Sequence, residues 1–201
     1  MPSNSSTTFP TPPRARSARR TCATALRTTR LPDVSIRPAR DGDAQAIAAI
    51  YAWHVANGTA TFDTEAPDTG AWAAKIADFA ARGFPFLAAE REGGIVAYAY
   101  AARFRDRAAY AHTCEDSIYV AHEARGGGIG SVLLPALIEA ARASGFQQMI
   151  AVIGGGEPAS VALHARCGFV HAGRMRNVGS KFGRLLDTVY MQRDLREDQN
   201  P

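Results

Sequence analysis

The sequence predicts an α/β (α+β) fold, built on a mixed, mostly antiparallel sheet of six to seven strands flanked by about four helices. Short runs of β-branched and aromatic residues alternate with longer segments whose apolar residues recur at helical spacing. A strand–helix–strand unit in the middle of the chain implies a parallel pair, because a crossover helix returns the chain to the same direction. Short connections on either side predict antiparallel pairs. We therefore expect one sheet covered by helices.

Composition divides the 201-residue chain into one domain and two tails. We expect the domain over residues 34–195 and a short C-terminal tail over residues 196–201. Residues 1–33 hold six arginines and one acid among many serines, threonines and prolines, with too few apolar residues to fold. This basic tail is expected to be disordered, either as an organelle transit peptide or as a plain extension, such as an upstream start codon would produce.

Charge and cysteine content narrow the functional classes. The chain carries a net charge of +4, all of it due to the N-terminal tail, so the domain is near neutral and no nucleic-acid surface is expected. No apolar run reaches the roughly 18–20 residues of a membrane span, so no membrane partner is expected. Three cysteines, Cys22, Cys114 and Cys167, are too few for a disulfide framework and predict a reducing, cytoplasmic location.

The first third of the domain predicts one strand and two helices. Residues 34–39 have a strand pattern. Asp41 or Asp43 then caps a helix that stops at Gly58. A second helix spans residues 68–82, where large apolar side chains share one face.

The middle of the domain predicts three strands. Residues 86–90 and 95–103 are strands joined across Glu92-Gly93-Gly94, which is typical of a hairpin turn. Residues 112–120 form a third strand, which leads into a glycine-rich turn.

The last third predicts two helices and three strands. Residues 129–144 form a helix in which Pro135 removes one backbone hydrogen bond and is expected to kink the first turns. Residues 157–167 form another helix, which ends at Gly168. The remaining strands are residues 148–153, 169–177 and 184–193.

The glycine-rich turn is the first candidate binding site. Arg125-Gly-Gly-Gly-Ile-Gly130 follows a strand and opens a helix, so unobstructed backbone N–H groups and the helix dipole meet at one place. Such a terminus binds pyrophosphate. The turn is not a dinucleotide fingerprint, because Ser131 and Leu133 stand where its last glycine would be, and it lacks the Gly-Lys-Ser/Thr of a P-loop. The alternative is a flexible turn without a ligand.

Two motifs together resemble the GNAT acyltransferase superfamily: Arg125-x-x-Gly128-x-Gly130 after a strand, and Ser160-x-x-Leu163-His-x-x-x-Gly168-Phe169. The resemblance covers roughly residues 34–195 and implies the GNAT fold. Further segments are similar to the phosphinothricin / methionine sulfoximine N-acetyltransferases, namely residues 50–51, 59–62, 97–100, 103–107, 110, 115–120, 151–154 and 179–183.

The resemblance implies acetyl-CoA as the acetyl donor and co-substrate. It assigns the pantetheine arm to the backbone of Ile118, Tyr119 and Val120, an extended edge whose amides can pair with it. It assigns the pyrophosphate to the turn and the residues beside it: Arg125, Gly126, Gly127, Gly128, Ile129, Gly130 and Ser131. Glu157 and Ser160 are expected near the CoA arm.

The chain departs from the family pattern at two places. Glu157 belongs to a segment where many relatives carry an asparagine, which places an acid near the expected arm. Leu185 stands where a tryptophan is often seen, a change that alters the shape of the substrate pocket.

Glu115 and His164 are the candidate catalytic residues. An amine nucleophile must lose a proton, and Glu115 can take it if burial raises its pKa from about 4.3. The alternative is a solvated carboxylate or an ion-pair partner of a nearby arginine. His164 could protonate the departing CoA thiolate, since its proton is exchangeable near neutral pH. The alternative is a core histidine with satisfied hydrogen bonds.

The acceptor site is expected around an arginine cluster. Arg103 and Arg105 lie beside Tyr110, and guanidinium groups pair with the carboxylate or phosphinate of an amino-acid substrate. Phe62 could supply an apolar wall. No metal site is expected.

These observations predict an N-acetyltransferase that moves acetyl from acetyl-CoA to the amine of a small amino acid or analogue, by direct attack in a ternary complex. Methionine sulfoximine, methionine sulfone and phosphinothricin are the expected acceptors, and the resemblance implies a homodimer. Two alternatives stay open: a GNAT enzyme for another amine (protein N-terminus, polyamine or antibiotic), and a non-catalytic acyl-CoA-binding module.

Overall fold

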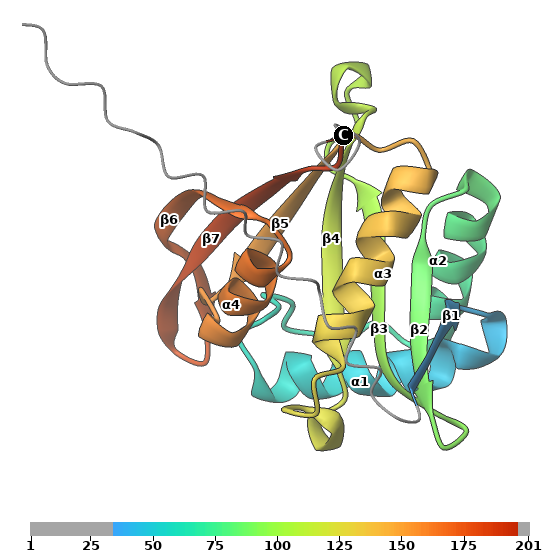
Figure 1. Ribbon diagram of the computed structural model, residues 1–201. Coiled ribbons are helices and arrows are strands. Elements are labelled where there is room, and N and C mark those ends of the chain that lie inside the picture. The colour runs from blue at the N-terminus through green and yellow to red at the C-terminus, as the bar shows by residue number, and fades with distance from the viewer. Residues whose placement is uncertain (1–33, 197–201) are drawn as a thin grey trace, which may run out of the picture.

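The computed structural model describes residues 34–196, so the predicted N-terminal tail and nearly all of the C-terminal tail lie outside the described residues. The predicted order of helices and strands is confirmed (Figure 1). The main elements are β1 (Val34–Pro38), α1 (Ala44–Asn57), α2 (Thr69–Arg82), β2 (Phe86–Arg91), β3 (Gly94–Arg103), β4 (Thr113–Val120), α3 (Gly130–Ala143), β5 (Gln148–Gly154), α4 (Pro158–Arg166), β6 (Val170–Lys181) and β7 (Arg184–Asp194).

The strands form one seven-stranded sheet in the order β1-β2-β3-β4-β5-β7-β6. β4 and β5 pair in parallel, and every other neighbouring pair is antiparallel. The predicted mixed, mostly antiparallel sheet is therefore confirmed. The parallel pair encloses α3, the crossover helix, as the strand–helix–strand pattern predicts.

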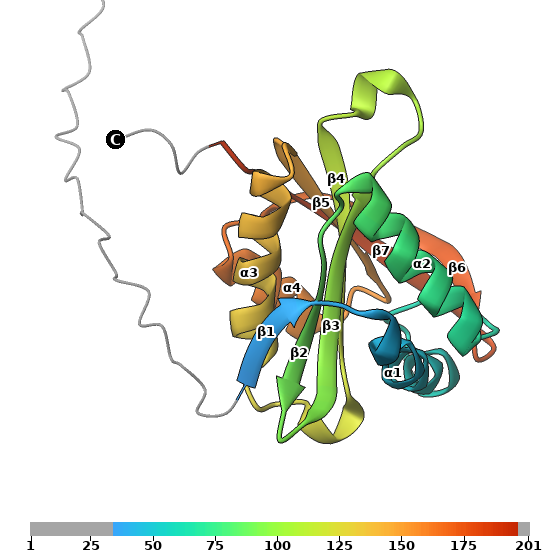
Figure 2. The same ribbon diagram turned by 90° about the vertical axis from the view of Figure 1, so that its right-hand side faces the viewer.

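Helices cover both faces of this sheet, with α3 on one side and α1 and α2 on the other (Figure 2). Alternation along β3 explains why the two faces differ. Ala97, Ala99 and Ala101 face α3 and leave room for its leucines, whereas Tyr98 and Tyr100 pack against α1 and α2. The core is thus aliphatic under α3 and aromatic under α1 and α2.

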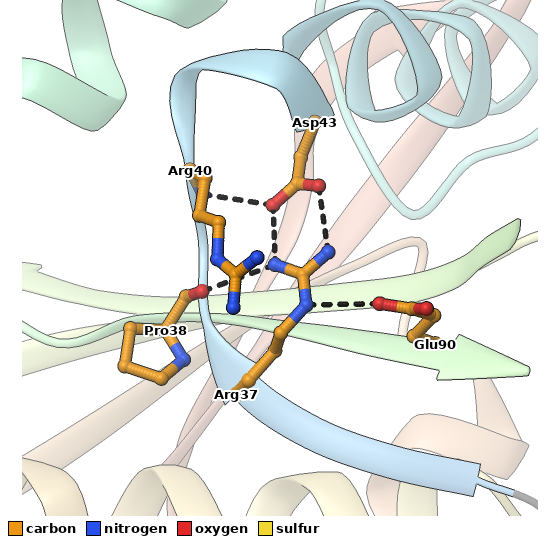
Figure 3. A network of polar contacts seen from close by, with 5 residues as sticks. All are labelled: Arg37, Pro38, Arg40, Asp43 and Glu90. Atoms are coloured by element: carbon orange, nitrogen blue, oxygen red, sulfur yellow. Dashed lines mark hydrogen bonds and ion pairs between the residues drawn. The ribbon is translucent and has the colours of Figure 1, made fainter. Parts of the chain in front are cut away.

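The start of α1 differs from the expected cap. Asp43 stands at the N-cap, but its carboxylate makes no capping bond to the helix. It binds the guanidinium of Arg37 at 2.8 and 2.9 Å and accepts the Arg40 N–H, while Arg37 also reaches Glu90 at 2.9 Å (Figure 3). The Arg37 hydrogen bonds lower the pKa of Asp43. The predicted N-cap position is confirmed at Asp43, but its carboxylate caps the short 3-10 turn Asp41–Asp43 through the Arg40 N–H and pairs with Arg37, rather than capping α1 itself.

Pro135 lies inside α3, which continues from Gly130 to Ala143 without a break, and the kink expected from it stays a prediction. One further difference concerns strand length. β6 runs four residues beyond the predicted end at position 177, because its pairing with β7 resumes at Gly179 after an irregularity between Met175 and Gly179. No helix within residues 34–196 is long and apolar enough to span a membrane.

Candidate active site

The site begins where the parallel strands part. β4 pairs with β5 only from Thr113 to Asp116, although β3 pairs with β4 as far as Val120 and β7 pairs with β5 as far as Gly154. Among the described residues, the edge of β4 beyond Asp116 that faces β5 therefore carries backbone N–H and C=O groups without a strand partner. One of these groups, the Val120 carbonyl, lies 2.9 Å from Nε2 of His54. Such an edge can pair with an extended ligand that contains amides.

A cleft opens at this divergence and is lined by β4, β5, α4 and the connection between α1 and α2. It brings together residues that are far apart in the sequence. Seven of the predicted site residues line it: Phe62, Glu115, Ile118, Tyr119, Glu157, Ser160 and His164.

The glycine-rich turn lies between β4 and α3. Gly126 and Gly128 have φ angles of 76° and 78°, in the left-handed region that glycine adopts without strain. Within residues 34–196, the backbone N–H groups of Gly126, Gly128, Ile129 and Gly130 donate no hydrogen bond to another backbone group. A Cβ on Gly130 would approach Leu163 of α4 to 3.0 Å, so glycine allows α3 to begin close to α4. Free donors at a helix N-terminus suit a pyrophosphate.

Glu115 projects from β4 into the cleft and is half-buried. Burial raises the pKa of Glu115, and the charge of Asp116 raises it further, while Arg105 lowers it. Its carboxylate makes no hydrogen bond or ion pair within residues 34–196. A half-buried carboxylate without a partner is suited to accept a proton.

His164 is almost fully buried at the wall of the cleft, with 2% of its surface exposed. Its Nε2 lies 3.0 Å from Oδ2 of Asp116, and its Nδ1 lies 2.7 Å from the backbone oxygen of Ser160. Burial lowers the pKa of His164, but the hydrogen bond and charge of Asp116 outweigh burial and raise it overall. Both contacts are with acceptors, so an imidazolium facing the Asp116 carboxylate satisfies both nitrogens.

The predicted arginine cluster lies apart from this cleft. Arg105 and Tyr110 surround a second hollow on the β3–β4 connection, together with Asp106 and Arg107. Arg103 is exposed at the end of β3. Among the described residues, Arg105 acts on the cleft through its charge, which lowers the pKa of Glu115. The structure thus brings Phe62 to Glu115 and leaves the three other predicted acceptor residues outside the cleft.

Residues 36–190 match the family of acetyltransferase (GNAT) domains. The chain belongs to the GNAT acetyltransferase family. The predicted resemblance is confirmed.

Individual relatives narrow the comparison. The chain is 48% identical to a phosphinothricin N-acetyltransferase of Alcaligenes faecalis over 162 residues, which cover 80% of this chain and 82% of that protein. It is 41% identical to an L-methionine sulfoximine/L-methionine sulfone acetyltransferase of Pseudomonas aeruginosa, covering 80% of this chain and 94% of that protein. A GNAT phosphinothricin acetyltransferase of Sinorhizobium meliloti, solved with acetyl-CoA, has a TM-score of 0.78 at 44% identity, covering 81% of this chain and 88% of that chain.

Asp116 lines the cleft and was not among the residues that the sequence interpretation assigned to the site. A local signal existed, because strand alternation turns the neighbours Glu115 and Asp116 to opposite faces of the sheet. One of two adjacent acids on a central strand must then be buried and needs a partner. His164 is that partner, 48 positions further along the chain. Within residues 34–196, no cluster of three or more His, Cys, Asp or Glu side chains is arranged to hold a metal ion.

Proposed function

We propose that the protein transfers acetyl from acetyl-CoA to the amine of a small amino acid or analogue, and that methionine sulfoximine, methionine sulfone and phosphinothricin are acceptors. One observation carries the proposal: the carboxylate of Glu115, which has no hydrogen-bond or ion-pair partner among residues 34–196, faces a cleft beside the edge of β4 that β5 leaves unpaired. The acceptors are those named for relatives at 41–48% identity.

The donor end of the site is proposed to hold acetyl-CoA through backbone groups. The free N–H groups of Gly128 and Gly130 would bind its pyrophosphate, with the exposed Arg125 close by in the chain. The backbone of Ile118 and the N–H of Val120 would pair with the amides of the pantetheine arm along this edge of β4, while the Val120 carbonyl stays with Nε2 of His54. This arrangement would lead the thioester into the cleft that Glu115 lines.

Glu115 is proposed as the general base. It takes a proton from the ammonium group of the acceptor, directly or through a water molecule, and the free amine attacks the thioester carbonyl. The tetrahedral intermediate loses the remaining extra proton of its nitrogen to water and collapses to the N-acetyl product and the CoA thiolate, which then takes up a proton. Burial supports this role because it raises the pKa of Glu115 and so makes the carboxylate a stronger base.

His164 is proposed to act from the wall of the cleft. Both of its ring nitrogens already face acceptors, so donating a proton to the thiolate would break one of these hydrogen bonds. The contacts favour a positioning residue that holds the wall of the cleft through Asp116 of β4 and the backbone oxygen of Ser160. The proton would then come from solvent.

An acceptor screen tests the proposal. CoA release is measured with the three amino-acid analogues, a polyamine, an aminoglycoside and a short peptide with a free N-terminus. We expect release with at least one of the analogues and not with the cationic acceptors. Release with the peptide alone would point to protein acetylation. Tight acetyl-CoA binding without release from any acceptor would indicate a binding module.

We also propose that the protein is a cytoplasmic homodimer. Large apolar side chains are exposed along the β6–β7 hairpin at the edge of the sheet: Val170, Met175, Val178, Phe182 and Leu185. A second copy would cover them. Light scattering coupled to size-exclusion chromatography should give a dimer for the wild type and a monomer for Leu185→Asp. A monomeric wild type at micromolar concentration would contradict the proposal.

A further inference from the structure

We propose that Gly179 and Lys181 of β6 are positioning residues that set the shape of the acceptor end of the cleft. They would do so by holding residues 59–63, which we call the acceptor wall. The inference rests on the proposed function, since it concerns the acceptor that Glu115 would deprotonate.

The acceptor wall needs support from outside. It lies between α1 and α2 and belongs to neither helix nor strand. Three of its residues, Ala60, Thr61 and Phe62, line the cleft together with Glu115. Any movement of the wall would therefore change the space beside the proposed base.

Glycines form a close-packed floor beneath this wall. A Cβ on Gly179 would lie 2.2 Å from Cε2 of Phe62 and 2.7 Å from its Cζ. A Cβ on Gly154 would lie 2.8 Å from the backbone oxygen of Thr59, and one on Gly155 would lie 2.6 Å from the Thr59 hydroxyl oxygen. These distances are below van der Waals contact, so the wall occupies the space where other residues have side chains. A Cβ at position 179 would clash with the side chain of Phe62 and not with backbone, so the Phe62 ring would have to move.

Lys181 secures the same wall by a hydrogen bond. Its Nζ donates to the backbone oxygen of Thr61 at 2.9 Å, 120 positions away in the sequence. Only 5% of the Lys181 surface is exposed, which is unusual for a lysine. Burial lowers the pKa of Lys181, although the charge of Asp63 opposes this shift. A buried ammonium group needs a hydrogen-bond acceptor, and the backbone oxygen of Thr61 supplies one.

Tyr51 of α1 holds the wall from the other side. Its hydroxyl lies 2.7 Å from Oγ1 of Thr61 and donates to the carboxylate of Asp63 at 2.6 Å. Since Tyr51 gives its only proton to Asp63, the Thr61 hydroxyl donates to Tyr51. The Tyr51 ring also packs edge-to-face against the ring of Tyr119, with ring centroids 5.0 Å apart. Tyr119 itself lines the cleft. The wall is thus held between α1 and β6.

This arrangement separates the two substrates. Gly179 and Lys181 contact the wall, whereas the donor would bind the glycine turn and the edge of β4. Loosening or displacing the wall should therefore raise the KM for the acceptor and leave acetyl-CoA binding unchanged. A residue that only stabilised the fold would lower the yield or the melting temperature. It would not raise the acceptor KM relative to the dissociation constant of acetyl-CoA.

The experiment compares Gly179→Ala and Lys181→Met with two matched controls. Gly173→Ala lies on the same strand and its added Cβ meets no atom within 4 Å. Lys75→Met replaces the other lysine of the chain. Lys75 belongs to α2, and its Nζ lies over the ring of Tyr100 on β3. For wild type and variants, kcat and KM for methionine sulfoximine are measured, and the dissociation constant of acetyl-CoA is measured by calorimetry.

We expect both test variants to raise the acceptor KM about tenfold or more, with kcat changed far less, because small pocket contacts discriminate on this scale. Acetyl-CoA affinity should stay within about twofold, and both controls should match the wild type. In the Gly179→Ala background, Phe62→Leu should recover much of the lost acceptor affinity, because it removes the clashing ring atoms. If Lys181→Met fails to fold, the Gly179 and Phe62 variants decide the question.

Two outcomes would overturn the inference, and they differ from failure of the proposed function. Unchanged acceptor KM in the test variants, with an active wild type, would contradict the inference alone. If acetyl-CoA affinity fell by the same factor as the acceptor KM rose, Gly179 and Lys181 would have a general structural role instead. A wild type that acetylates no acceptor in the screen would contradict the proposed function, and this inference with it.

Discussion

Replacing Asp116 by asparagine should destabilise the fold in a pH-dependent way. The change is isosteric, and the side chains of Asp116 and His164 are each 2% exposed, so packing is preserved and the charge pair is removed. His164 keeps its Nδ1–H bond to the oxygen of Ser160. The new amide can donate to Nε2 only when His164 is neutral, so protonation of His164 would leave a buried cation without a counter-charge.

The magnitude follows from these two hydrogen bonds. At high pH the variant exchanges a charged hydrogen bond for a neutral one, a loss of about 1 kcal/mol. At low pH it lacks the partner of a buried ion pair, a loss of about 3 kcal/mol or more. Asp116 raises the pKa of His164 above its usual value. The stabilisation from this shift is therefore fully present below a pH of about 6.5 and is lost as the pH rises through the folded-state pKa.

The assay is guanidinium chloride unfolding of wild type and Asp116→Asn at about pH 5.5 and about pH 8.5, around the titration range of histidine. We expect the difference in unfolding free energy to be larger at the lower pH. Asp187→Asn serves as the control, because Asp187 pairs with Arg174 on the surface. An equal difference at both pH values, or a larger one at high pH, would refute a charged His164–Asp116 pair.

Three other predictions concern catalysis and the donor site. Glu115→Gln should lower kcat about 100-fold or more while acetyl-CoA affinity stays unchanged; unchanged turnover would remove Glu115 as the base. The wild-type rate should rise with pH through the raised pKa of Glu115, and Arg105→Gln should move this rise to higher pH, because Arg105 lowers that pKa; a pH–rate profile that does not move would contradict the coupling. Gly128→Ala should cost about 1–2 kcal/mol in stability because of its positive φ, and should weaken acetyl-CoA binding in calorimetry, with Gly42→Ala as a control that meets no atom within 4 Å.

Local patterns predicted the element order because each pattern acts within a few residues. Strand alternation, helical spacing and turn glycines depend on neighbours in the chain. The capping of α1 by the Asp43 carboxylate was predicted wrongly for the same reason: the competing partner of Asp43 is Arg37, a side chain on the preceding strand. Propensity ranks Asp43 as a cap, but the carboxylate binds the strongest donor that the fold places beside it.

The sequence predicted some residues of the candidate site correctly and misplaced others. Glu115 and the cleft-lining residues of β4 follow from one strand, so a motif on that strand identifies them. Arg103, Arg105 and Tyr110 also form a plausible set in sequence, but the β3–β4 connection carries Arg105 and Tyr110 to a separate hollow and leaves Arg103 exposed at the end of β3. The direction that such a connection takes depends on contacts beyond its own residues, which composition does not contain.

The sequence by itself determined the fold class, the glycine turn and the family, because these depend on local backbone preferences and on the order of residues along the chain. Only the tertiary structure decided how the cleft is completed. It paired Asp116 with His164, and it laid Phe62 on Gly179 and Thr61 on Lys181. These contacts join segments 48 to 120 positions apart, and their distances are set by the packing of the whole sheet against its helices.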